Sequence, residues 1–171
     1  MSRSTFECGK GGKLMEDLDQ IFDDIALRVK IYGYFFTVTN KIQAMGDKVL
    51  DGLTMRQQYL MVILSKFETY APTLQELAYV FGSSYQNVKR MASQLEEKGY
   101  LDIRKDPIDR RKIRIILNRK KYNSLRDDLG QSTDEFFNKV YKGLSEKELN
   151  KLGEALTLID KNISKLDEDL A

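Results

Sequence analysis

Residues 101–117, LDIRKDPIDRRKIRIIL, are the part of this chain that most restricts its fold. Apolar and charged residues alternate on both sides of an Asp-Pro pair. This period-two pattern predicts strands at 101–105 and 111–117, joined by a turn over 106–110. Both prolines of the chain lie in turn-like contexts, and most of the remaining sequence is compatible with helices. The expected fold class is therefore mainly α with a small β-hairpin (α+β).

Two capping boxes before the hairpin predict the starts of two helices. Thr54 is followed three residues later by Gln57, and Thr73 is followed in the same way by Glu76. In this arrangement the threonine hydroxyl and the third side chain each satisfy a backbone N–H group of the first helical turn. The second of these helices is expected over residues 74–81, after a proline that ends the preceding segment.

A third helix is expected over residues 84–98, directly after a tight turn. Gly82 allows the chain to turn sharply, and Ser83 or Ser84 caps the new helix. Ala78 lies four residues before the glycine, where two crossing helices require a small side chain. The spacing predicts a helix-turn-helix, and the hairpin that follows is then a wing. Without the hairpin and its charge, the same spacing is typical of any helix pair joined by a glycine turn.

Longer helices are expected at both ends of the chain. Apolar residues recur every three or four positions from Leu14 to about Met45, which predicts one amphipathic helix. Near the C-terminus the steps alternate strictly between three and four, as in a coiled-coil seam. The seam residues are Leu149, Leu152, Leu156, Ile159, Ile163, Leu166 and Leu170. We interpret both ends as dimerisation helices, and the alternative is a helix packed on the core of its own chain.

Charge and composition exclude several classes of function. Residues 83–121 carry 12 Lys and Arg against 5 Asp and Glu, although the net charge of the whole chain is only +2. A basic segment of this kind favours a polyanionic partner. The absence of histidine removes histidine bases and histidine metal ligands. With one cysteine and neither a signal peptide nor a membrane span, we expect a cytoplasmic protein that is not an enzyme and needs no cofactor or metal.

Three segments resemble the MarR (multiple antibiotic resistance regulator) family of winged helix-turn-helix transcription factors. They are LTMRQQYLMVIL, TLQELAYVFGSSYQNVKRMASQLEEKGYL and RKDPIDRRKIRIIL, within residues 53–117. The resemblance implies a homodimer that binds pseudo-palindromic double-stranded DNA, usually as a repressor and often released by a small ligand. We therefore expect a flexible arm at 1–13, a DNA-binding domain at 49–118, and a dimerisation region formed by 14–48 and 119–171.

The resemblance and the exposed positions of the third helix together define the candidate DNA-binding residues. In the family, the last arginine of the wing motif enters the minor groove, which corresponds to Arg111 here, with Asp109 as its orienting partner and Arg110 as a substitute. Hydroxyl, amide and cationic side chains of the third helix are suited to phosphates and base edges. These are Ser83, Ser84, Tyr85, Gln86, Asn87, Lys89 and Arg90. The alternatives are a capping or packing role for Asn87 and a surface salt bridge for Arg90.

Other candidate residues have equally ordinary interpretations. Tyr32 and Phe36, in an aromatic cluster, are candidates for an effector pocket, although such a cluster is also typical of a core or a dimer interface. Cys8 is a candidate oxidant sensor, but only Lys10 is near enough in sequence to lower its pKa. An acidic group around residues 16–24 suggests a metal site or a solvated helix face. The bases at 119–121, where the family usually has a different sequence, extend a phosphate-binding surface or are surface charges.

Two other functions are compatible with the same sequence. A winged helix that binds proteins would show no salt-dependent affinity for DNA and would be indifferent to the loss of Arg111. A small-molecule-binding protein without DNA activity would bind a ligand with no effect on DNA. The sequence does not identify the operator, the regulated genes or the effector.

Overall fold

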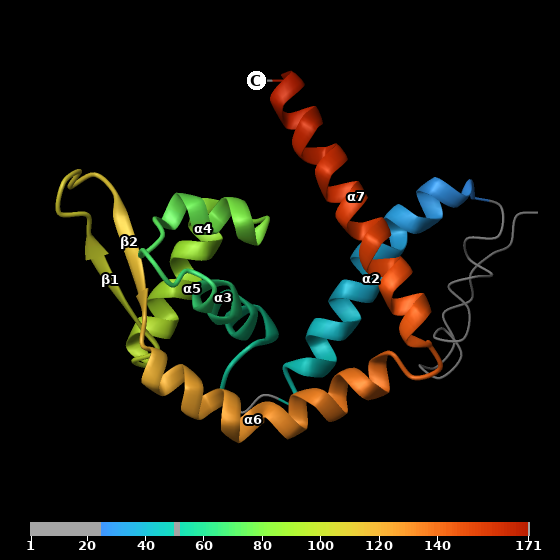
Figure 1. Cartoon of the computed structure of the whole chain (residues 1–171), viewed down its shortest axis with the longest axis horizontal. Helices are drawn as coiled ribbons and strands as arrows, with labels where there is room; N and C mark the ends of the chain where they lie inside the picture. Colours follow the sequence, from blue (N-terminus) through green and yellow to red (C-terminus); the bar gives the residue numbers. More distant parts are fainter. Residues whose placement is uncertain (1–24, 50–51, 171) are drawn as a thin grey trace, which may run out of the picture. The chain divides into compact units, whose positions relative to one another are not determined.

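The computed structural model describes residues 25–49 and 52–170, in two units (Figure 1). The first unit ends at Met45 and the second begins at Gly46. In the first unit, α2 (Leu27–Gly46) is the long helix predicted near the N-terminus, and it ends as expected close to Gly46.

The predicted start of that helix is wrong within the described residues. Ile25 and Ala26 are not helical, so one continuous helix does not run from Leu14 to Met45. The Ala26 carbonyl accepts hydrogen bonds from the N–H groups of Val29 and Lys30 and thereby begins the helix. Alanine carries no side-chain cap that would mark this start in the sequence, and the three- and four-residue spacing continues across it.

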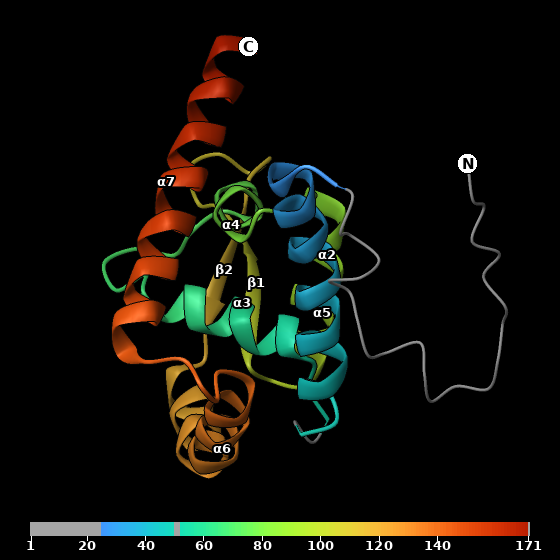
Figure 2. The same cartoon turned by 90° about the vertical axis from the view of Figure 1, so that its right-hand side faces the viewer.

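The second unit begins with the predicted helix-turn-helix and hairpin, α3 (Met55–Ser65), α4 (Leu74–Phe81), α5 (Tyr85–Glu97), β1 (Leu101–Lys105) and β2 (Ile113–Leu117) (Figures 1 and 2). Both capping boxes are present, at Thr54 and at Thr73, and Ser84 is the residue that caps α5. Gly82 has φ of 62°, the left-handed conformation that the sharp turn requires. The mainly α fold with a two-stranded hairpin is confirmed.

The core of the second unit lies where these short elements meet. Leu60 of α3, Leu77 of α4 and Leu95 of α5 have no exposed surface, and Ile115 of β2 is 1% exposed. Ala78 is also buried, as expected for the crossing of α4 and α5. Side chains of α3, α4, α5 and β2 all contribute to this core. Their packing therefore holds α5 and the wing in fixed positions relative to each other.

The hairpin pairs antiparallel, with Leu101 opposite Leu117 and Lys105 opposite Ile113. The second strand begins at Ile113 and not at Arg111 as predicted. The Arg111 N–H group donates to the Asp109 carboxylate, and the Lys112 N–H group donates to the Asp109 carbonyl. These local bonds keep Arg111 and Lys112 in the turn, where alternation of residue types alone would place them in the strand.

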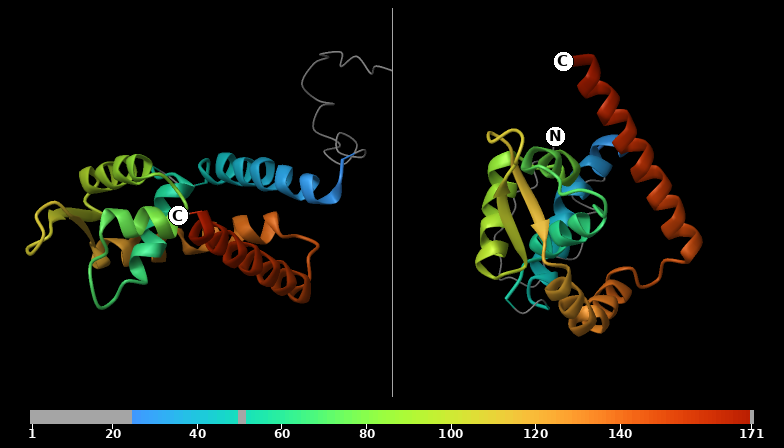
Figure 3. Two further views of the ribbon diagram at one scale, coloured as in Figure 1. Left: turned by 90° about the horizontal axis from the view of Figure 1, so that it is seen from above. Right: turned by 60° about the vertical axis from the view of Figure 1, so that its left-hand side comes forward.

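Two long helices complete the second unit, and Figure 3 shows them from two further directions. Asn118 caps α6 (Arg119–Val140), as predicted, by accepting a hydrogen bond from the Lys121 N–H group. The last helix is α7 (Glu146–Leu170). Within the described residues, no helix is sufficiently long and apolar to cross a bilayer.

Candidate nucleic-acid interface

The first turns of α5 present polar side chains on an exposed surface. The inner face of the helix is buried through Val88, Met91 and Leu95, which fixes the direction of the opposite face. On that face Tyr85 is 39% exposed. The other exposed residues there are Ser84, Gln86, Asn87, Lys89 and Arg90, while Ser83 is half-buried. The structure thus brings together the predicted third-helix residues at one helix end.

In the described part of the chain, the side chains of Asn87 and Arg90 take part in neither the cap of α5 nor an ion pair. The Asn87 backbone N–H group, not its side chain, takes part in the cap, by donating to Ser84 Oγ at 3.3 Å. Arg90 forms no ion pair with any residue in the described part of the chain. Capping and salt-bridge roles therefore do not account for these two side chains.

Arg56 is a cation beside this face that sequence reasoning missed. Its Nη2 atom donates to Ser83 Oγ at 3.4 Å, and its guanidinium carbon lies 5.3 Å from the centre of the Phe81 ring. The ring and the hydroxyl orient the guanidinium next to the helix-turn-helix turn. Twenty-seven positions separate Arg56 from Ser83, so no local sequence pattern could have indicated the contact.

A buried carboxylate holds the wing in shape. Asp106 is 4% exposed, and its Oδ1 atom accepts hydrogen bonds from the N–H groups of Ile108 and Asp109, both at 2.8 Å. Its Oδ2 atom pairs with Arg114 Nε, and Arg114 Nη1 donates to the Ala71 carbonyl. The backbone bonds from the turn and the Arg114 bond lower the pKa of Asp106 to about 2.

The Asp109–Arg111 pair has the geometry predicted from the sequence. Arg111 Nε lies 3.0 Å from Asp109 Oδ1, and Nη2 lies 3.2 Å from Oδ2, so the pairing is bidentate. The side chain of Arg111 is nevertheless 91% exposed. Hydrogen bonds from the Arg111 side chain and backbone lower the pKa of Asp109. The carboxylate thus orients a guanidinium that remains open to a partner, and Arg110 beside it is exposed as well.

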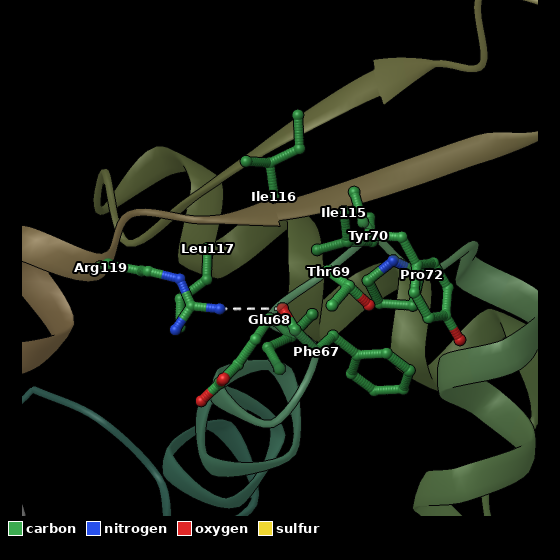
Figure 4. A pocket seen from close by; sticks show the side chains of 11 residues that line it. Phe67, Glu68, Thr69, Tyr70, Pro72, Ile115, Ile116, Leu117 and Arg119 are labelled. Atoms are coloured by element: carbon green, nitrogen blue, oxygen red, sulfur yellow. Dashed lines mark hydrogen bonds between the residues drawn. The ribbon is translucent and has the colours of Figure 1, made fainter.

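The bases at the start of α6 have mixed roles. Arg119 donates to the Phe67 carbonyl at 2.8 Å (Figure 4) and to the Ser65 carbonyl at 3.3 Å. It thereby caps the C-terminal end of α3. Lys121 donates to the Lys98 carbonyl and lies 4.6 Å from the centre of the Tyr100 ring. Arg119 and Lys121 therefore hold the fold together, while Lys120 is exposed.

Besides a hollow along α7, the second unit has two hollows that are lined in part by α3. The smaller, about 260 Å³, lies between β2 and the loop before α4, and Phe67, Tyr70, Ile116 and Arg119 are among its lining residues (Figure 4). The larger, about 400 Å³, lies between α3 and α6. Sequence reasoning missed this groove because its two walls are far apart in the chain. We call it the α3–α6 groove, lined by Met55, Gln58, Tyr59, Val62, Tyr122, Leu125, Arg126, Gly130, Thr133, Asp134 and Phe137.

The remaining candidates are only partly described. Tyr32 and Phe36 of α2 stack edge to face, with ring centres 5.0 Å apart, and are 61% and 56% exposed. Their role in an effector pocket stays a prediction. Cys8 and the acidic group at 16–24 lie outside the described residues.

Comparison with known proteins points to one family. The MarR family model matches residues 53–113. Among curated proteins, none matches this chain.

Solved structures share the fold. A MarR-family transcriptional regulator from Rhodococcus sp. RHA1 is 22% identical with a TM-score of 0.68, covering 79% of this chain and 95% of its own. Sco3205 of Streptomyces coelicolor, a MarR-family regulator in complex with DNA, is 16% identical with a TM-score of 0.67 and coverages of 77% and 84%. BpsR of Bordetella bronchiseptica, whose DNA binding is regulated by 6-hydroxynicotinic acid, is 16% identical with a TM-score of 0.65 and coverages of 77% and 98%.

The family model spans the helix-turn-helix, β1 and the turn of the wing, and it ends at the first residue of β2. These elements carry the polar face of α5 and the Asp109–Arg111 pair. The chain is therefore similar to the MarR family over residues 53–113, and it shares the fold of solved MarR-family regulators.

Proposed function

We propose that this protein is a dimeric, sequence-specific DNA-binding transcriptional regulator that represses from a pseudo-palindromic operator. The family match and the likeness to regulators that include the DNA complex of Sco3205 support the proposal. The observation that carries it is the wing, where Asp109 orients Arg111 by two hydrogen bonds while leaving 91% of the Arg111 side chain exposed. An oriented, solvated guanidinium next to a polar helix end is suited to a groove of DNA.

Each part of the interface has a distinct proposed role. Ser83, Ser84 and the first N–H groups of α5 contact phosphate, since a helix N-terminus favours anions. Tyr85, Gln86 and Asn87 approach base edges in the major groove, with Lys89 and Arg90 on bases or phosphates. Arg111 enters the adjacent minor groove, and Arg110 contributes charge beside it.

The experiment is selection of bound fragments from a random duplex library, at about 150 mM salt, with Arg111→Ala in parallel. We expect enrichment of an inverted repeat with half-sites about one helical turn apart, weakened by the substitution. Arg104→Ala is a matched control, because Arg104 is an exposed arginine of the same hairpin that pairs with Asp102. Indifference to the loss of Arg111, with no enriched sequence, would contradict the proposal and favour a protein-binding winged helix.

Dimerisation is supported by the seam of α7. Leu152 and Leu156 are 45% and 42% exposed, and Ile163 and Leu166 are 59% and 60% exposed, whereas Leu149 and Ile159 are half-buried. This exposure favours a seam covered by a partner over a seam packed on its own chain. A partner helix would cover a narrow apolar stripe of this kind.

A ligand-controlled release from DNA is supported by the α3–α6 groove. Its volume of about 400 Å³ lies in the range of small-molecule sites. In the described part of the chain, Thr133 Oγ1 in its wall is the buried side-chain polar atom without a hydrogen-bond partner. A ligand with a polar group on an aromatic ring would satisfy this hydroxyl and cover Tyr59 and Phe137.

The first probe is 6-hydroxynicotinic acid, the molecule that regulates BpsR. We expect binding to raise the melting temperature and to weaken operator binding, and Thr133→Val to reduce both effects. Thr157→Val on α7 is the matched control, because the Thr157 hydroxyl donates to the Gly153 carbonyl within its own helix. Ligand binding that leaves DNA affinity unchanged would contradict an effector role.

A further inference from the structure

Ile108 lies at the tip of the wing with 95% of its surface exposed. It is the most exposed of the large hydrophobic residues in the described part of the chain. Single exposed apolar residues are common on protein surfaces, so exposure alone does not assign a role. Ile108 differs from such residues because its turn is held in place and it lies three positions before Arg111.

The turn that carries Ile108 is ordered by hydrogen bonds. The Ile108 N–H group donates to Asp106 Oδ1 at 2.8 Å, and the Asp109 N–H group donates to the same atom. Pro107 precedes it and fixes its own φ angle. Asp106 itself is buried and tied to Arg114, which is bonded to Ala71. This chain of contacts fixes the backbone from which the isoleucine projects.

The charges around the tip indicate what the isoleucine meets. Asp109 follows Ile108 and pairs with Arg111. Arg110, Arg111 and Lys112 come next, Lys105 ends β1, and all four cations are exposed. An apolar side chain in a turn with several exposed cations is unsuited to an apolar protein surface, because the cations would lose hydration. It is suited to the minor groove of DNA, where phosphates line both edges and sugars and base edges form the interior.

We propose that Ile108 packs against the floor of the minor groove beside Arg111 and makes the wing selective for A·T over G·C base pairs. The proposal rests on the proposed DNA-binding function. In the minor groove, G·C differs from A·T by the guanine N2 amino group. An apolar side chain against that donor removes water from it and offers no acceptor, which is unfavourable. Arg111 anchors the wing, and Ile108 penalises guanine.

A minor-groove footprint of the wild type and of Arg111→Ala first identifies the base pairs that the wing protects. The test then uses operators that differ only at those base pairs. Those positions carry A·T, G·C, inosine·C, which lacks the N2 amino group, or 2,6-diaminopurine·T, which adds it to an A·T pair. Kd is measured for the full-length wild type, Ile108→Ser and the conservative Ile108→Val. Because the Ile108 side chain is exposed, both variants are expected to fold, and their melting temperatures check this.

For the wild type and Ile108→Val, we expect A·T and inosine·C operators to bind about tenfold more tightly than operators with an N2 amino group, roughly the effect of one unsatisfied buried donor. Arginine alone also favours narrow A·T grooves. The decisive quantity is therefore the ratio of Kd for operators with the N2 amino group to Kd for operators without it, measured in Ile108→Ser. A fall of this ratio to within about twofold, with Arg111 intact, supports the proposal. An unchanged ratio overturns it and leaves the proposed function standing. No binding of any duplex by the wild type would overturn both.

Discussion

At Asp106, one carboxylate connects the tip of the wing to the body of the domain. It accepts two backbone N–H groups of the turn and pairs with Arg114, and Arg114 donates to the Ala71 carbonyl before α4. Since Asp109 and Arg111 continue from this turn, their orientation depends on a residue that does not itself face a ligand. Because these contacts require the ionised Asp106 carboxylate, protonation of Asp106 at low pH should weaken the order of the wing.

We predict that folding stability depends on the ionisation of Asp106. The pKa of Asp106 is about 2 in the folded protein, against an ordinary value of 3.8. The unfolded chain therefore binds more protons between these values, and the stabilisation is present above about pH 4 and lost as pH falls towards 2. Asp106→Asn should melt at a lower temperature than wild type at pH 7, and the difference should shrink to near zero at about pH 2. Thermal unfolding across this range measures it.

The control for this prediction is Asp102→Asn. Asp102 pairs with Arg104 at 3.0 Å, but both side chains are more than half exposed, and surface pairs of this kind contribute little. A pH-dependent loss of the same size in Asp102→Asn would show that Asp106 is not the cause.

Leu77 and Val80, on the same helix, differ in what they contribute to stability. Leu77 has no exposed surface, whereas Val80 is 53% exposed. Leu77→Ala should lower the free energy of unfolding by about 2–5 kcal/mol through lost burial and a cavity. Val80→Ala should change it by less than about 0.5 kcal/mol. Urea unfolding of both variants measures the contrast, and equal losses would mean that α4 is not packed as described.

At the scale of elements, two glycines should respond to alanine with opposite sign. Gly82 ends α4 with φ of 62°, and an added Cβ meets nothing within 4 Å, so Gly82→Ala is penalised by backbone conformation alone, by about 1 kcal/mol. Gly130 lies inside α6, again with nothing within 4 Å of an added Cβ. Gly130→Ala should raise the free energy of unfolding by up to about 1 kcal/mol. Urea unfolding measures the sign of the change in the free energy of unfolding for each variant. A stabilising Gly82→Ala would contradict the turn geometry.

The features of these elements that could be predicted from the sequence are those encoded locally. Each capping box lies within four residues, so Thr73 and Glu76 placed the start of α4 correctly. The Asp109–Arg111 pair was likewise predictable, because the two residues are two positions apart. The start of β2 was not, since backbone bonds to Asp109 compete with strand alternation there.

What the sequence could not predict depends on contacts across the chain. Arg119 lies 54 positions from Ser65, whose carbonyl it caps. From the sequence alone, Arg119 cannot be told apart from an arginine that binds phosphate. Arg56 beside Ser83 and the two walls of the α3–α6 groove are of the same kind. Ile108 is a different case, because only its exposure distinguishes it from the alternating isoleucines that follow.

At the scale of the whole molecule, the proposed interface is half of a symmetric one. One winged domain reaches one half-site, and an inverted repeat requires two domains at a fixed spacing. The exposed seam of α7 is the surface that supports this pairing, through residues such as Leu156 and Ile163. Assembly and DNA affinity should therefore change together when the seam is disrupted.

We predict that Leu156→Glu converts the protein to a monomer and that Leu158→Glu does not. Leu156 lies on the seam, whereas Leu158 lies off it on the same helix and is 60% exposed. A glutamate on the seam places a charge in the proposed interface, where burial is costly. Sedimentation velocity measures the mass of each variant, and the selected inverted repeat measures binding. Loss of the linked second half-site should weaken binding by about 10²- to 10⁴-fold for Leu156→Glu. A dimeric Leu156→Glu, or equal effects of both variants, would place the dimer interface elsewhere.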